Sequence, residues 1–125
     1  MAPLARLPVF LALDGKRALV AGGSAAAAWK AELLSAAGAQ VDVYANSFSE
    51  ELQALAGDPP RGPVVLTMRR WSAADLNGAN IATGAFEIVA DAEAFARAAR
   101  IAGVPVNVID RPAFCDFSFG AIVNR

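Results

Sequence analysis

Histidine is absent from this sequence, and cysteine occurs once, as Cys115. The missing histidine removes the commonest general base and the commonest nitrogen ligand of metal ions. A Ser-His-Asp triad, a zinc finger and a zinc hydrolase site are therefore excluded, and no resident metal is expected. Any acid–base chemistry must depend on the 12 carboxylates, the lysines, the tyrosine or the single thiol.

Charge, disulfides and long apolar runs are also scarce. Charged residues make up 18% of the chain, and the formal net charge of −1 gives no sign of binding to nucleic acid or a membrane surface. A single cysteine cannot form an intrachain disulfide, so we expect a reducing, cytoplasmic location. No apolar run approaches the roughly 20 residues of a transmembrane helix, and the first six residues do not form a signal peptide.

What the chain has is enough apolar material for one core. It is 56% hydrophobic over 125 residues, which predicts a single domain spanning residues 1–125. Strands are expected at residues 17–21, 41–45, 64–68, 80–83 and 104–109, and helices at 25–37, from 49 onward and at 91–100. This alternation predicts a Rossmann-like α/β fold, a doubly wound parallel sheet.

Two further expectations concern the first third of the chain. Residues 7–13 are predicted to be an extended edge piece, followed by a hairpin-type turn at residues 14–16. In the helix at 25–37, Ala26, Trp29 and Leu33 fall at helical spacing, which predicts that this face, with its tryptophan, lies in the core.

A glycine pair follows the first predicted strand and precedes the helix. Unpaired N–H groups at a helix N-terminus favour an anion, so such a corner can bind the pyrophosphate of a dinucleotide. The dinucleotide fingerprint would place small residues at Gly22, Ser24 and Ala27, and its second glycine is missing. The pattern alone leaves open a phosphate site or a merely well-packed turn.

Ligands of doubly wound sheets bind beyond the carboxyl ends of the strands, at the switch point. That rule selects four places, which together favour a nucleotide site over a packing turn. They are residues 22–26, Asn46 with Ser47, Thr83 with Gly84 and Ala85, and Asp110.

Several segments also occur in an order and spacing typical of one known family. They are residues 7–11, 22–24, 29–34, 37–39, 106–110, 115–117 and 121–125. On these segments, which span almost the whole chain, the sequence resembles the N-terminal module of the sirohaem synthase family, the bifunctional precorrin-2 dehydrogenase and sirohydrochlorin ferrochelatase.

The resemblance implies NAD-dependent oxidation of precorrin-2 to sirohydrochlorin, followed in bifunctional members by insertion of ferrous iron to give sirohaem. Tetrapyrroles and ferrous iron would then be the substrates, and the full-length form would be a homodimer. Asp110 matches the family's catalytic aspartate. Together with the strand-end rule, the resemblance predicts that NAD contacts Gly22, Gly23, Ser24, Ala25, Ala26, Asn46, Ser47, Gly84 and Ala85.

The chain departs from the family pattern in three places. Ser24 stands where the family usually has a third consecutive glycine, and residues 83–87 replace its usual alanine-alanine-threonine-acid segment. The family continues beyond the position of Arg125 with a dimerisation domain and a further helical segment. We therefore expect an isolated or truncated module, with an incomplete substrate pocket.

Several alternatives stay open from sequence. Asp110 could act as a base or simply form the turn before Pro112. Cys115 is expected to be a buried apolar side chain rather than a nucleophile. The group of Phe114, Phe117 and Phe119 either lines a tetrapyrrole pocket or covers the sheet. The whole chain could instead be a non-catalytic nucleotide-sensing domain of a regulator or transporter.

Overall fold

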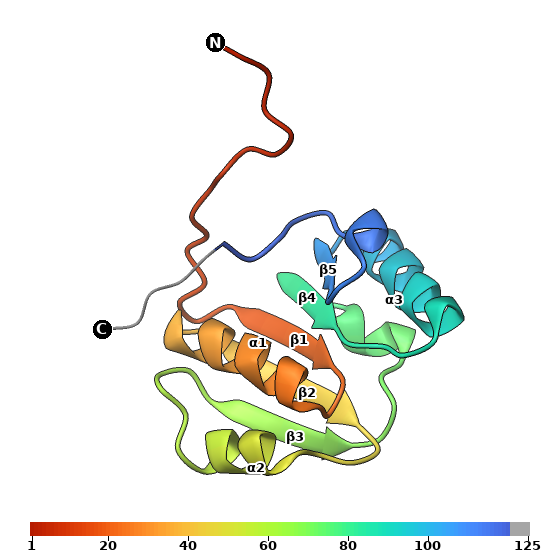
Figure 1. Cartoon of the computed structure of the whole chain (residues 1–125). Helices are drawn as coiled ribbons and strands as arrows, with labels where there is room; N and C mark the ends of the chain where they lie inside the picture. The colour runs from red at the N-terminus through yellow and green to blue at the C-terminus, as the bar shows by residue number, and fades with distance from the viewer. Residues whose placement is uncertain (121–125) are drawn as a thin grey trace.

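A computed structural model describes residues 1–120 and contains one five-stranded parallel sheet with the strand order β3-β2-β1-β4-β5 (Figure 1). The predicted α/β fold is therefore confirmed. The last stretch of the family resemblance, residues 121–125, lies outside the described residues. The strands are β1 (Arg17–Ala21), β2 (Gln40–Ala45), β3 (Val64–Met68), β4 (Ile81–Gly84) and β5 (Val106–Val108).

Helices cover both faces of the sheet, as Figure 1 shows. Helices α1 (Ala25–Ala36) and α2 (Glu50–Gly57) pack on one face. The short 3-10 helix η1 (Ala73–Leu76) and helix α3 (Val89–Ile101) pack on the other. Because side chains alternate along a strand, the sheet separates two cores, with Val20 facing α1 and Leu19 facing α3.

The N-terminal segment corrects one expectation. Residues 7–13 form no strand, and Leu7 and Phe10 are 74% and 102% exposed. β1 is already paired on both sides, with β2 and β4, so no sheet edge is open beside the start of the chain. The turn itself exists, with Lys16 N–H donating to the Leu13 carbonyl at 2.9 Å, but it is not a hairpin turn. Figure 1 shows the segment leading away from the sheet.

Helix α1 corrects a second expectation. Its buried side includes Ala27, Ala28, Ala31 and Leu34, whereas Trp29 is 47% exposed. Alanines occupy nearly every side of this helix, so apolar spacing alone does not select the buried face. Alanine side chains let the helix backbone approach the sheet closely, and an indole in their place would hold the two elements apart.

The tail after β5 covers the sheet. It passes through the short 3-10 helix η2 (Pro112–Phe114), after which Asp116 N–H donates to the Val106 carbonyl at 2.7 Å. Phe117 and Phe119 pack against the core on the α1 side and Phe114 packs on the α3 side, as the interpretation that this group covers the sheet predicts. Cys115 is half-buried, and its Sγ accepts from Val108 N–H at 3.2 Å.

An ion pair fastens the segment between β3 and η1. Both terminal nitrogens of Arg69 donate to the Asp75 carboxylate, each at 2.8 Å, and Ser72 N–H donates to it at 2.7 Å. The Arg69 hydrogen bonds, aided by those from Ser72, lower the pKa of Asp75 although burial opposes the shift.

Replacing this carboxylate gives a prediction for stability against pH. The pKa of Asp75 is lower in the folded state than the ordinary aspartate pKa, which is about 4. The charge of Asp75 therefore stabilises the fold above about pH 4, and this contribution is lost as pH falls further. Urea unfolding of Asp75→Asn should therefore show reduced stability at pH 7, with the difference from wild type shrinking below about pH 4. Asp58→Asn, an exposed control, should have the same free energy of unfolding as wild type at every pH. If Asp75→Asn lost as much free energy of unfolding at pH 3 as at pH 7, the lowered pKa of Asp75 would be contradicted.

Candidate dinucleotide-binding site

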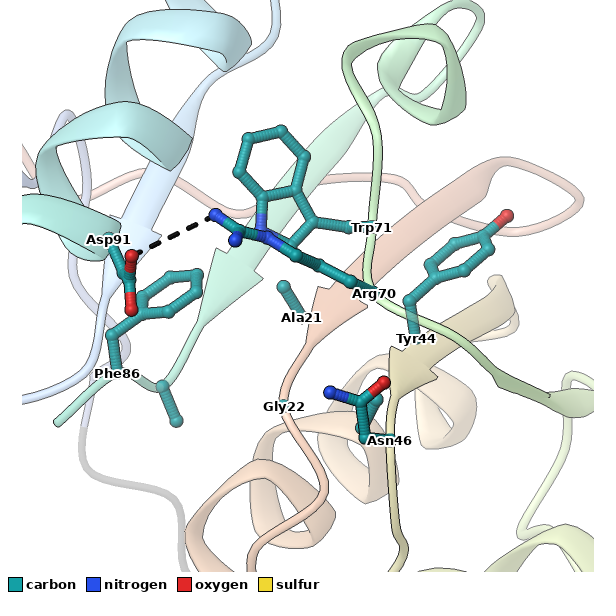
Figure 2. Close-up of a pocket in the computed structure, with 10 residues that line it drawn as sticks. Ala21, Gly22, Tyr44, Asn46, Arg70, Trp71, Phe86 and Asp91 are labelled. Carbon is teal, nitrogen blue, oxygen red and sulfur yellow. Dashed lines mark ion pairs between the residues drawn. The ribbon is translucent and has the colours of Figure 1, made fainter. Parts of the chain in front are cut away.

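The switch point of the sheet lies between β1 and β4, the two neighbouring strands from which the winding runs in opposite directions. A pocket of about 240 Å³ opens there, at the carboxyl ends of β1, β2 and β4 (Figure 2). Its lining residues are Ala21, Gly22, Tyr44, Ala45, Asn46, Arg70, Trp71, Ala85, Phe86 and Asp91.

Two glycines bring the turn after β1 against the turn after β2. Gly22 has φ +136°, a conformation that side-chain-bearing residues rarely adopt. A Cβ on Gly23 would lie 1.8 Å from the Ser47 carbonyl oxygen. Backbone hydrogen bonds join the same turns, from Gly22 N–H to the Tyr44 carbonyl and from Ser49 N–H to the Gly23 carbonyl. Gly23 is thus required by the protein's own backbone packing.

Helix α1 begins immediately after these glycines. Ser24 caps it, since its hydroxyl oxygen accepts from Ala27 N–H at 3.2 Å. Among residues 1–120, no hydrogen-bond acceptor is recorded for the N–H groups of Ser24, Ala25 and Ala26, and all three residues are exposed. These unpaired donors at the positive end of a twelve-residue helix fit the negative charge of a pyrophosphate.

The predicted contacts after β2 and β4 occupy different environments. Asn46 lines the pocket and is exposed, as is Ser47 beside it. Ala85 also lines the pocket, with its Cβ 3.3 Å from the position a Cβ would take on Gly22. Gly84 is buried, and a Cβ there would lie 2.5 Å from the Phe86 ring, so this glycine serves packing.

Thr83 lies in the core rather than in the pocket. It is 1% exposed, and its hydroxyl donates to the Asn107 side-chain oxygen at 2.9 Å. Of the segment after β4 selected by the strand-end rule, Ala85 alone lines the pocket.

Asp110 follows β5 at the same edge of the sheet. The adjacent Ile109 N–H donates to the Gly84 carbonyl at 2.9 Å, which ties this turn to the end of β4. Asp110 is exposed, has φ +61°, and forms no side-chain hydrogen bond or ion pair with the described part of the chain. It does not line the 240 Å³ pocket, whereas Gly22, Asn46 and Ala85 of the predicted NAD contacts do.

Sequence reasoning missed the far wall of the pocket. Arg70 and Trp71 follow β3, Phe86 follows β4, and Asp91 lies in the first turn of α3. Arg70 and Trp71 stand at the carboxyl end of a parallel strand, so the rule that selected Asn46 would also have selected them.

The close approach of Gly23 predicts a large difference between two glycine substitutions. Gly23→Ala should destabilise the fold by about 3 kcal/mol, because backbone atoms on both sides must separate. Gly57→Ala, at the end of α2 with nothing within 4 Å of the new Cβ, should be neutral or stabilising. Urea unfolding of both variants measures this, and equal stabilities would contradict the packing role of Gly23.

Two further observations limit the kinds of site present. Within residues 1–120, no group of three cysteine or acidic side chains is arranged to hold a metal ion. None of the helices in that range has the length and apolarity needed to cross a membrane.

Comparisons with known proteins agree with the fold. A family model described as "Putative NAD(P)-binding" matches residues 9–121. Siroheme synthases of Ectopseudomonas mendocina and Thiobacillus denitrificans are 39% and 40% identical over 119 residues, which is 95% of this chain. The chain spans only 25% and 24% of those two proteins.

A solved structure of SirC, precorrin-2 dehydrogenase, has the same fold. It superposes with a TM-score of 0.65 at 20% identity, covering 94% of this chain and 54% of SirC. The chain therefore belongs to this NAD(P)-binding family and is related to the N-terminal NAD(P)-binding module of siroheme synthases.

Proposed function

We propose that this chain is the dinucleotide-binding part of an NAD-dependent precorrin-2 dehydrogenase, which forms sirohydrochlorin in sirohaem biosynthesis. The observation that carries the proposal is the convergence at one sheet edge of unpaired N–H groups, a pocket and an exposed carboxylate. The similarity to siroheme synthases supports the choice of substrate.

The residues at the start of α1 would hold the dinucleotide. The N–H groups of Ser24, Ala25 and Ala26 donate to the pyrophosphate, and Gly22 lets the backbone turn beneath it. Asn46 and Ser47 would offer neutral hydrogen bonds to the adenosine ribose, while Ala85, directly after β4, would border the cofactor. When bound, NAD supplies the acceptor for the hydride that leaves precorrin-2.

Asp110 would take the proton that leaves with the hydride. Oxidation removes two hydrogens from precorrin-2, one as hydride and the other as a proton, and the proton needs a base. Asp110 is exposed at the end of β5, and its carboxylate is engaged by no described side chain. Its φ of +61° lies in the left-handed region, which aspartate and asparagine adopt more readily than most residues.

The same carboxylate would serve iron insertion in a bifunctional form. Ferrous iron enters sirohydrochlorin only as the pyrrole nitrogens lose their protons, and Asp110 is the base we assign to them. We propose a cytoplasmic homodimer as the setting, with the single half-buried Cys115 suiting a reducing compartment.

Cofactor binding by this chain is tested by adding one negative charge at each end of α1. Ala26→Glu places a carboxylate in the first turn, where it suits the helix dipole but repels a pyrophosphate. We expect its Kd for NAD, measured by calorimetry, to rise at least tenfold. Ala36→Glu, at the exposed last position of the same helix, should bind NAD like wild type. Equal NAD affinities of the two variants would contradict the pyrophosphate site.

The role of Asp110 is tested by Asp110→Asn in the natural protein that carries this chain. Asparagine also tolerates positive φ, so the turn should persist while the base is lost. NAD-dependent turnover of precorrin-2 should fall about 100-fold or more, with NAD affinity unchanged. Glu87→Gln, the nearby exposed control, should turn over normally. Wild-type turnover by Asp110→Asn would remove Asp110 from the mechanism, and no turnover by any form would favour a nucleotide sensor.

A further inference from the structure

The pocket beside the glycine corner has an unusual distribution of polar groups. In dinucleotide sites, an acidic residue about 20 positions beyond the glycine turn commonly hydrogen-bonds the 2′-hydroxyl of the adenosine ribose. That acid also repels the 2′-phosphate of NADP. Here the residues after β2 are Asn46 and Ser47, which carry no charge. The acid after β2 is therefore missing, and the carboxylate that does line this pocket, Asp91, belongs to α3.

A cation stands in the same pocket. Arg70 follows β3, the strand next to β2, and its side chain crosses the pocket wall toward α3 (Figure 2). Its only ion pair among the described residues is a long contact of 3.8 Å between Nη2 and Asp91 Oδ1. The Arg70 side chain remains 63% exposed, so it is loosely held and costs little to redirect.

The neighbouring Arg69 provides the contrast. It is bound by two hydrogen bonds of 2.8 Å to Asp75 and lies 4.8 Å from the centre of the Tyr44 ring. The Arg69 guanidinium is thus already engaged by Asp75 and Tyr44 within the fold. Of these two adjacent arginines, Arg70 alone lines the pocket.

Trp71 adds a second donor on the same wall. Its indole Nε1 is buried and has no hydrogen-bond partner in the described part of the chain. The ring is held edge-on against Phe95 at 5.1 Å, and the Arg70 guanidinium lies 5.9 Å from a Trp71 ring centre. A buried donor without a partner is costly, and an acceptor brought by a ligand would relieve it.

We infer that this pocket accepts the 2′-phosphate of NADP, with Arg70 as the residue that binds it, so that NADP binds at least as tightly as NAD. The inference rests on the proposed dinucleotide site and adds a specificity-determining residue to it. On binding, Arg70 would leave its long ion pair with Asp91 and donate charge-assisted hydrogen bonds to the 2′-phosphate.

The test measures dissociation constants of the full chain for NAD and NADP by calorimetry. The fragments 5′-AMP and adenosine 2′,5′-bisphosphate, which differ only by the 2′-phosphate, serve as a second pair of probes. Wild type should bind NADP at least as tightly as NAD. Arg70→Gln should weaken the binding of NADP about tenfold and that of NAD less than threefold. It should likewise weaken the binding of adenosine 2′,5′-bisphosphate more than that of 5′-AMP.

Two further variants sharpen the result. Asp91→Asn removes the carboxylate that competes for Arg70, so NADP binding should tighten two- to threefold relative to NAD binding. Arg97→Gln removes an exposed cation of α3 that pairs with Glu93 and does not line this pocket, and both affinities should match wild type.

The possible failures are distinguishable. If wild type binds NAD at least tenfold more tightly than NADP, or if Arg70→Gln weakens both equally, the role of Arg70 is wrong and the proposed function stands. If neither dinucleotide binds, the proposed function and this inference both fail.

Discussion

The contact between the Gly23 backbone and the Ser47 carbonyl is the constraint on which the candidate site depends. A Cβ at Gly23 would lie 1.8 Å from that oxygen, so the turns after β1 and β2 touch with no room for a side chain. This contact fixes where α1 begins, and therefore where the N–H groups of Ser24, Ala25 and Ala26 point. A glycine commonly credited with admitting a ligand is here required by the fold itself.

Around that corner, the sheet edge divides into regions with different chemistry. The start of α1 offers unpaired donors for an anion, and the β3 side adds Arg70 and the indole N–H of Trp71. The turn after β5 presents Asp110 without a partner among the described residues. Cofactor binding and proton transfer are thus proposed for separate strands, which the parallel sheet aligns at one edge.

Much of this arrangement could be predicted because it follows from local pattern. Apolar runs and glycine turns indicated all five strands, and the strand-end rule selected Asn46 and Ala85, which line the pocket. The buried side of α1 could not be predicted, since alanine is nearly uniform around the helix and Trp29 falls on the exposed side. Residues 7–13 look like a strand locally, but strand pairing depends on which edges remain open, which is a property of the whole sheet.

The central claim is that the start of α1 binds a dinucleotide pyrophosphate, and amide chemical shifts during an NAD titration test it most directly. The account predicts that the largest changes occur at the backbone N–H groups of Ser24, Ala25 and Ala26, with smaller ones at Asn46. Changes confined to other surfaces, or none at millimolar NAD, would contradict it.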